Sequence, residues 1–281
     1  MSQILLIAVL LLTFFAVSTV LGVFGKGGGD FYVPLLITAG VSFHEASTTS
    51  LFILILAGLS MAHVFHRERM VDWALALVVF SVTGIFSFLG GYVSVSIPPA
   101  YLKATFAAML LVSAYFIRVK KDVLAHRNEN RKSKNESGRG EKENIGRVWH
   151  RPYGGGYNIA KKDMVVMLFL FSVVGFVAGM VGISGGGVIV PVMILVGGVP
   201  IRVAFGTNAA LVFMTSTFGF LGHAAAGGVN WHLTLPLAVV AIVGSQIGSR
   251  ISHRIETPRL SSYFVWVLVG AAVWMLVKIY I

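Results

Sequence analysis

The sequence predicts an all-α integral membrane protein, built from two inverted-topology repeats of about five membrane segments each. Three observations predict this fold class. The 281 residues are 56% hydrophobic, with a mean hydropathy of +0.84, and only 12% are charged, whereas a soluble domain is usually about 25% charged. Several apolar stretches reach the roughly 20 residues that a transmembrane helix needs. The two halves of the chain also resemble each other.

A basic segment at residues 118–162 separates the two halves. It contains 13 of the 22 Lys and Arg residues against 5 acidic residues, and so supplies most of the net charge of +11. An excess of Lys and Arg usually marks a cytoplasmic loop. We therefore expect an N-terminal transmembrane repeat at 1–117, a basic cytoplasmic linker at 118–162 and a C-terminal transmembrane repeat at 163–281. This distribution argues against a nucleic-acid partner.

The internal repeat is clearest at two glycine-rich loops, one in each half. Residues 22–40 and 179–197 are identical at 8 of 19 aligned positions. The correspondence continues further along the chain, where Trp73 falls on Trp231. A match of this extent between apolar segments indicates a duplication that spans nearly all of both halves.

The first apolar stretch lacks the basic start of a signal peptide, so we expect a retained membrane helix that continues to Val23. In the second half the candidate membrane helices are residues 163–181, 203–225, 231–250 and 258–280.

Each half also has a short apolar segment directly after its glycine loop, at about 30–42 and 187–199. Thirteen helical residues span only about 20 Å, less than a hydrocarbon core of about 30 Å. Short segments interrupted by Gly or Pro, at matching places in two inverted halves, point to the binding site of a transporter. A short packing helix is the alternative.

The positions of the basic residues predict how the halves are oriented. If both short segments cross the membrane, His66–Arg69 and Arg250–Arg259 lie on the same side as the linker, as the positive-inside tendency requires. Each half then crosses the membrane five times, and an odd number of crossings gives the halves opposite orientations. Both termini are then expected outside.

The glycine loops have the chemistry of an anion site. Glycine lets backbone amides approach a ligand closely, and a helix that begins after the loop presents free N–H groups and the positive end of its dipole. Polar residues follow both loops at matching positions, although hydrogen bonding between helices is an alternative role for them. The candidate substrate-binding residues are Gly25, Lys26, Gly28, Gly29, Thr49, Ser50, Gly182, Ser184, Gly185, Gly186, Thr207 and Asn208.

Four further polar residues in the apolar stretches are candidates for gating or proton coupling: Asp30, His63, His223 and Gln246. An ionisable group at membrane depth is a functional candidate by default, and histidine titrates near neutral pH. The alternative for the histidines is a packed or interfacial position. For Asp30 the alternative is an ion pair with Lys26.

Several classes of protein lack support in this sequence. The chain has no cysteine and no Walker A or HExxH pattern, which are the signatures of thiol or disulfide chemistry, ATP hydrolysis and a common class of metal-dependent hydrolases. We expect no enzymatic activity, no cofactor and no metal site. The composition leaves open a carrier of another small anion, a cation or a metabolite, and also a membrane assembly subunit. A homo-oligomer is open as well.

The doubled pattern G-x-x-G-G-G/D-x-x-x-P, at Gly25–Pro34 and Gly182–Pro191, resembles the TauE/SafE sulfite exporter family. The segments ASTTS at 46–50 and GTNAA at 206–210 share this resemblance, and so does the basic central loop. The resemblance implies a multi-pass transporter of the prokaryotic cytoplasmic membrane. Its implied substrates are small sulfur-containing oxyanions, such as sulfite, or organosulfonates such as sulfoacetate. We expect export by alternating access.

Overall fold

The computed structural model describes residues 3–115, 148–149, 157–224, 229–252, 269–270, 272–274 and 277. The expected last membrane segment at 258–280 lies almost entirely outside the described residues, as does most of the linker.

The described part of the chain is mostly helical. Its helices are α1 (Gln3–Gly22), α2 (Gly29–Thr38), α3 (Phe43–Arg67), α4 (Trp73–Ser94), α6 (Lys161–Val181), α7 (Gly186–Leu195), α8 (Ile201–Ala224) and α9 (Trp231–Ile251). Residues 99–115 are helical as well. The short strands β1 (Val148–Trp149) and β2 (Tyr157–Asn158) form an antiparallel pair.

Five of these helices, namely α3, α4, α6, α8 and α9, are long and apolar enough to cross a membrane. The structure therefore confirms the predicted class, an all-α integral membrane protein. A ten-residue helix, α2 or α7, follows each glycine loop.

The helix starts are of two kinds. The long helices α3, α4 and α9 begin at Ser42, Asp72 and Asn230, whose side chains accept a hydrogen bond from the first turn. The short helices α2 and α7 begin instead at Gly28 and Gly185, which have no side-chain cap. Both of these glycines adopt the left-handed conformation, with φ of 103° and 68°. Glycine reaches this conformation without the steric penalty of other residues.

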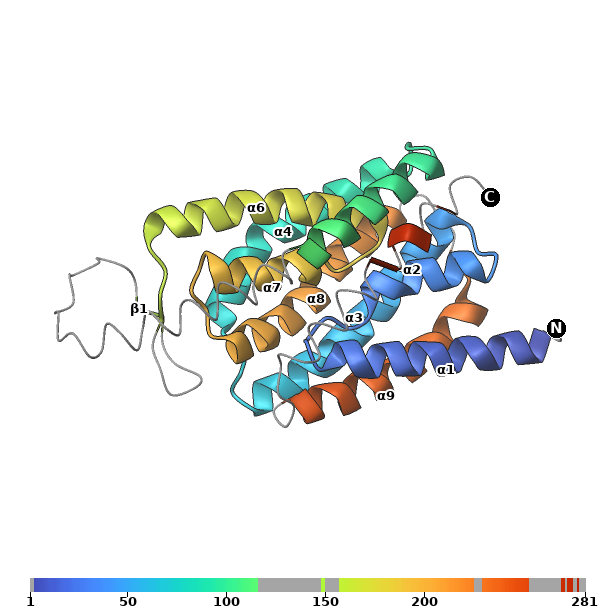
Figure 1. Ribbon diagram of the computed structural model, residues 1–281, viewed down its shortest axis with the longest axis horizontal. Helices are drawn as coiled ribbons and strands as arrows, with labels where there is room; N and C mark the ends of the chain where they lie inside the picture. Colours follow the sequence, from blue (N-terminus) through green and yellow to red (C-terminus); the bar gives the residue numbers. More distant parts are fainter. Residues whose placement is uncertain are drawn as a thin grey trace.

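Helix α4 packs closely along α6, as Figure 1 shows. Gly175 lies against the backbone of Thr83, and Gly179 lies against the backbone of Ser87. From the first contact to the second, the residue numbers rise in both helices, so the two helices run parallel. Glycine at these positions lets the two backbones approach closely, which is a common basis of helix association in membranes.

Helix α1 packs along α9 in the same way (Figure 1). Thr19 contacts Gly244 and Gly22 contacts Gly248, so these helices also run parallel. Gly22 additionally lies against the backbone of Ser245, with a distance of 2.9 Å between an added Cβ and the Ser245 oxygen. In the sequence alignment of the halves, this contact is the counterpart of the one between α6 and α4.

Helices α3 and α8 cross each other at the centre of the bundle (Figure 1). Gly58 of α3 lies against Phe213 of α8, whereas Leu51, earlier in α3, lies against Gly219, later in α8. The two helices are therefore antiparallel. They occupy corresponding positions in the two halves, and each contributes the polar segment that follows its glycine loop.

The close helix pairs generate the first prediction. Gly179→Ala should destabilise the protein, because the new Cβ would collide with the backbone oxygen of Ser87, which cannot move without shifting α4. Overpacking of this kind costs about 1–3 kcal/mol and lowers the midpoint of thermal unfolding by several degrees. Gly270→Ala is the matched control, since an added Cβ there has no heavy atom within 4 Å among the described residues. Equal midpoints for both variants would contradict the packing.

Candidate functional site

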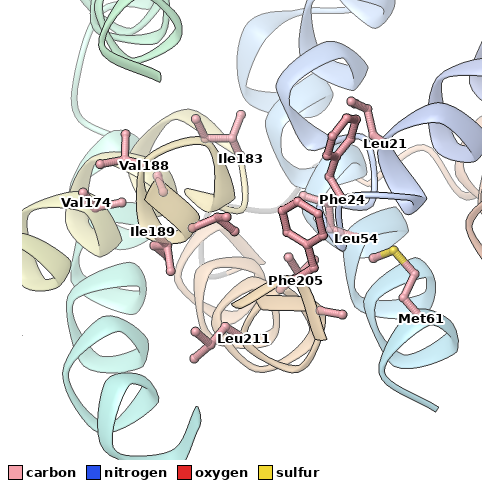
Figure 2. Packing of buried hydrophobic residues seen from close by; sticks show 14 of the residues in the cluster. Leu21, Phe24, Leu54, Met61, Val174, Ile183, Val188, Ile189, Phe205 and Leu211 are labelled. Atoms are coloured by element: carbon pink, nitrogen blue, oxygen red, sulfur yellow. The ribbon is translucent and has the colours of Figure 1, made fainter. Parts of the chain in front are cut away.

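The two glycine loops meet in the interior of the bundle. The first loop is residues 23–28 and the second loop is residues 182–185, and both are buried. The Ser184 hydroxyl lies 3.5 Å from the backbone oxygen of Lys26. Figure 2 shows the apolar packing around the loops, in which the ring of Phe24 meets the ring of Phe205 edge-on, with centroids 5.6 Å apart. In this conformation the loops are closed off from solvent.

A pair of equivalent hydrogen bonds holds each loop to the opposite half. The Ser50 hydroxyl on α3 donates to the backbone oxygen of Gly182 at 2.8 Å. The Asn208 side-chain Nδ2 on α8 donates to the backbone oxygen of Gly25 at 2.7 Å. Ser50 and Asn208 are counterparts in the sequence alignment, and so are the two glycines. The polar segments predicted from the repeat therefore contact the loops directly, and Ser47 of the first segment also lies against Gly182.

The adjacent threonines bond elsewhere. The hydroxyl of Thr49 lies 3.2 Å from that of Thr234 in the first turn of α9. The hydroxyl of Thr207 accepts a hydrogen bond of 3.1 Å from the backbone N–H of Asp72, the cap of α4. In this conformation both hydroxyls join helices to one another, which is the alternative role considered for such residues. Thr49 and Thr207 are thus the sequence neighbours of the loop-contacting Ser50 and Asn208, but their hydroxyls face the ends of neighbouring helices.

The two loops present free backbone amides. No described acceptor takes the N–H groups of residues 27–30, nor those of residues 184–187. Each group of four stands at the N-terminus of a ten-residue helix, where the dipole favours negative charge. Successive N–H groups in such a turn form an anion-binding concavity. Gly28, Gly29, Gly185 and Gly186, four of the candidate substrate-binding residues, contribute N–H groups to these two sets.

Lys26 and Asp30 form a buried ion pair inside the first loop and the start of α2. Their side chains are 5% and 3% exposed, and the Lys26 Nζ lies 3.6 Å from the Asp30 Oδ2. The ammonium also borders the second half, because a Cβ added at Gly187 would lie 3.5 Å from Lys26 Nζ. A charged pair at this depth is costly and marks a functional site by default.

The other gating candidates lie away from the loops. His223 is buried, with Nε2 2.8 Å from the backbone oxygen of Gly179 and Nδ1 3.4 Å from the Ser94 hydroxyl, so it joins α8 to α6 and α4. The side chain of His63 is exposed and that of Gln246 is half-buried. Of the four candidates, Asp30 is the one that the structure places among the loop residues.

Two residues at the site were not predicted. Ser113, in the helix at 99–115, is buried, and a Cβ added at Gly187 would collide with its hydroxyl. The Tyr32 hydroxyl donates to the backbone oxygen of Gly27 at 2.5 Å, and its ring stacks on Phe14. Neither had a distinguishing signal, because a single serine or tyrosine in an apolar stretch matches no repeated polar position.

The end of the linker is bound to the helical bundle. The Tyr157 hydroxyl donates to the Asp72 carboxylate at 2.6 Å, and burial, followed by the contact with Asp72, raises the pKa of Tyr157. Asp72 also caps α4. The adjacent Met70 backbone lies against Gly206 at the start of α8. The linker end, the turn between α3 and α4 and the start of α8 therefore share one end of the molecule.

Long apolar helices around buried glycine loops, whose amides have no described acceptor, are typical of one class of protein: a multi-pass membrane transporter. The comparison with protein families gives the particular family. The model of the sulfite exporter TauE/SafE family matches residues 10–275. The chain belongs to this family.

Two relatives that align with most of this chain are also named as membrane transporters. The probable membrane transporter protein YunE of Bacillus subtilis (strain 168) is 28% identical over 248 residues, which cover 85% of this chain and 86% of the relative. The probable membrane transporter protein MJ0441 of Methanocaldococcus jannaschii is 23% identical over 275 residues, covering 91% and 90%. No solved structure matches the chain significantly. The chain is a membrane transporter and not an enzyme, and the relatives' names specify no substrate.

The hydrogen bonds between the halves generate the second prediction. Ser50→Ala should lower the midpoint of thermal unfolding, because it leaves the buried oxygen of Gly182 without its donor. A buried polar group without a partner costs about 1–3 kcal/mol. Ser81→Ala is the control, since Ser81 is exposed and its hydroxyl bonds only to Val78 within its own helix. If Ser50→Ala unfolds at the same temperature as Ser81→Ala, the bond does not stabilise the loop.

Proposed function

We propose that the protein is a secondary transporter that exports small sulfur-containing oxyanions, sulfite or an organosulfonate such as sulfoacetate, across the prokaryotic cytoplasmic membrane. The observation that carries the proposal is the meeting of two helix starts. Each half contributes four N–H groups without a described acceptor at a buried helix start, and a Cβ added at Gly187 of α7 would lie 3.5 Å from Lys26 Nζ. The family to which the chain belongs supports the choice of sulfur oxyanions.

The electrostatics of the loops favour an anion over a cation. The polar groups of the loops without a described partner are mostly backbone N–H donors. The positive ends of the α2 and α7 helix dipoles add to the preference for a negatively charged ligand. The carboxylate of Asp30 is already beside the Lys26 ammonium. Within the described residues, no group of three or more His, Cys, Asp or Glu side chains is placed to hold a metal ion. An oxyanion, which accepts several hydrogen bonds at once, suits such a site.

We propose further that the halves form an inverted repeat and work by alternating access. Three observations support this: α3 and α8 are antiparallel, α1–α9 packing mirrors α6–α4 packing, and each loop accepts a hydrogen bond from the other half. The counterparts Thr49 and Thr207 contact Thr234 and Asp72, at the starts of α9 and α4, near opposite ends of the bundle. Opening one contact or the other would expose the loops to one side at a time, driven by a gradient of substrate or of a coupled ion.

The distribution of basic residues supports a cytoplasmic linker. Arg67 and Arg202 lie near the end of the molecule to which Tyr157 anchors the linker. Arg250 belongs to the same end, because α9 runs parallel to α3, with Thr234 near Thr49 and Ser245 near Ala57. Positive residues gathered at one end of a helical bundle mark the cytoplasmic side.

The third prediction tests transport. Purified protein in lipid vesicles should move labelled sulfite or sulfoacetate, and Gly186→Ala should reduce that flux at least tenfold. The added methyl would lie 2.7 Å from the Asn208 amide nitrogen and so would block the start of α7. Gly270→Ala should transport like the wild type. Vesicles that carry neither anion would contradict the substrate assignment, and equal flux from both variants would contradict the site.

The fourth prediction tests the topology. The chain has no cysteine, so single cysteines can be labelled cleanly in intact cells. A cysteine at position 68, in place of the exposed Glu68, should react only after the membrane is made permeable. A cysteine at position 232, in place of the exposed His232, should react from outside with an impermeant reagent. The opposite pattern would place the linker outside and contradict the proposed orientation.

A further inference from the structure

The starts of α2 and α7 differ in charge, although they are counterparts. Helix α2 has an acidic residue in its first turn, Asp30, whose buried carboxylate supplies a negative charge at the positive end of the dipole. The counterpart of Asp30 in α7 is Gly187, and the first turn of α7 has no acidic residue. The free N–H groups at 184–187 therefore have no charge of their own to stabilise them. An anion bound at α7 would supply the negative charge that Asp30 supplies at α2.

The side chain of Asn208 covers the start of α7. A Cβ added at Gly186 would lie 2.7 Å from Asn208 Nδ2 and 3.2 Å from Oδ1. The orientation of the amide follows from its hydrogen bond: the oxygen of Gly25 can only accept, so Nδ2 must face it. The amide oxygen Oδ1 consequently points elsewhere.

This amide oxygen is a buried acceptor without a hydrogen-bond partner among the described residues, and Asn208 is 0% exposed. Such a group is costly unless something donates to it. The counterpart Ser50 gives its single proton to the oxygen of Gly182, and its hydroxyl is not among the unpartnered buried atoms. The unpartnered acceptor therefore occurs at the same helix start that lacks a built-in carboxylate.

We propose that the site at α7 selects an oxyanion that carries its own hydrogen-bond donor, an inference that rests on the proposed function. The oxygens of the anion accept from the N–H groups of residues 184–187, with the Lys26 ammonium nearby, and a hydroxyl or ammonium of the same molecule donates to Asn208 Oδ1. Hydrogensulfite fits this site better than the sulfite dianion. A hydroxy- or amino-substituted sulfonate fits better than a plain alkyl sulfonate.

A matched pair of sulfonates tests the selection without changing the pH. 2-Hydroxyethanesulfonate and 1-propanesulfonate have the same number of heavy atoms and the same charge, and differ in one hydroxyl. For the full chain in lipid vesicles, we expect 2-hydroxyethanesulfonate to compete with labelled sulfite at about five- to tenfold lower concentration, the usual effect of one buried hydrogen bond.

The matched variant is Asn208→Ser, which introduces the residue that the other half has at this position. A serine retains a donor for the oxygen of Gly25, as Ser50 does for Gly182. We expect the preference to fall below twofold in this variant, because the ratio of the two competing concentrations reports the hydroxyl and cancels any general change in affinity for sulfonates. Size-exclusion chromatography and thermal unfolding check that the variant is folded.

Three outcomes would overturn the inference. Equal competition by the two sulfonates in the wild type would show that the site ignores the hydroxyl, while the proposed function would stand. An unchanged preference in Asn208→Ser would show that another group accepts the hydroxyl. Competition that requires sodium, and that loses this requirement in Asn208→Ser, would assign Oδ1 to a cation. Absence of sulfite flux and of sulfonate competition together would instead show that the proposed function itself is wrong.

Discussion

The structure depends on one constraint, that backbone groups of an irregular loop at membrane depth must find partners inside the protein. The glycine loops interrupt the helices, so their carbonyl and amide groups lose the partners that a helix provides. Ser50 and Asn208 satisfy one carbonyl in each loop, at Gly182 and Gly25, and each does so from the opposite half. The two halves are thereby tied to each other at the loops.

The same constraint explains why the amides remain free. A side-chain cap would satisfy them, as Ser42, Asp72 and Asn230 do at the long helices. Glycine at the starts of α2 and α7 offers no cap, so a ligand can take this role. In the first half the carboxylate of Asp30 lies next to the Lys26 ammonium, and in the second half nothing comparable is present among the described residues. The two loops thus have similar backbones but different charge.

Much of the fold could be predicted because it depends on local composition. The expected helix at 231–250 is observed as Trp231–Ile251, and the expected short segments begin with α2 and α7, directly after the glycine loops. The polar residues after the loops were harder to assign. Thr49 and Ser50 are neighbours in the sequence, yet one faces α9 and the other a glycine loop. Successive side chains on a helix point about 100° apart. Which of two neighbouring side chains faces the glycine loop therefore depends on where the other helices lie.

By itself, the sequence determined that this protein is a helical membrane protein, that its halves are related, and that its glycine loops precede short helices. These properties follow from hydrophobicity and from the special backbone freedom of glycine, which need no knowledge of distant contacts. Only the tertiary structure decided that Asn208 covers α7 with an unpartnered oxygen, and that Ser113 borders Gly187. Both depend on helices far apart in the chain being packed together, and no pattern within one segment records which surfaces will meet.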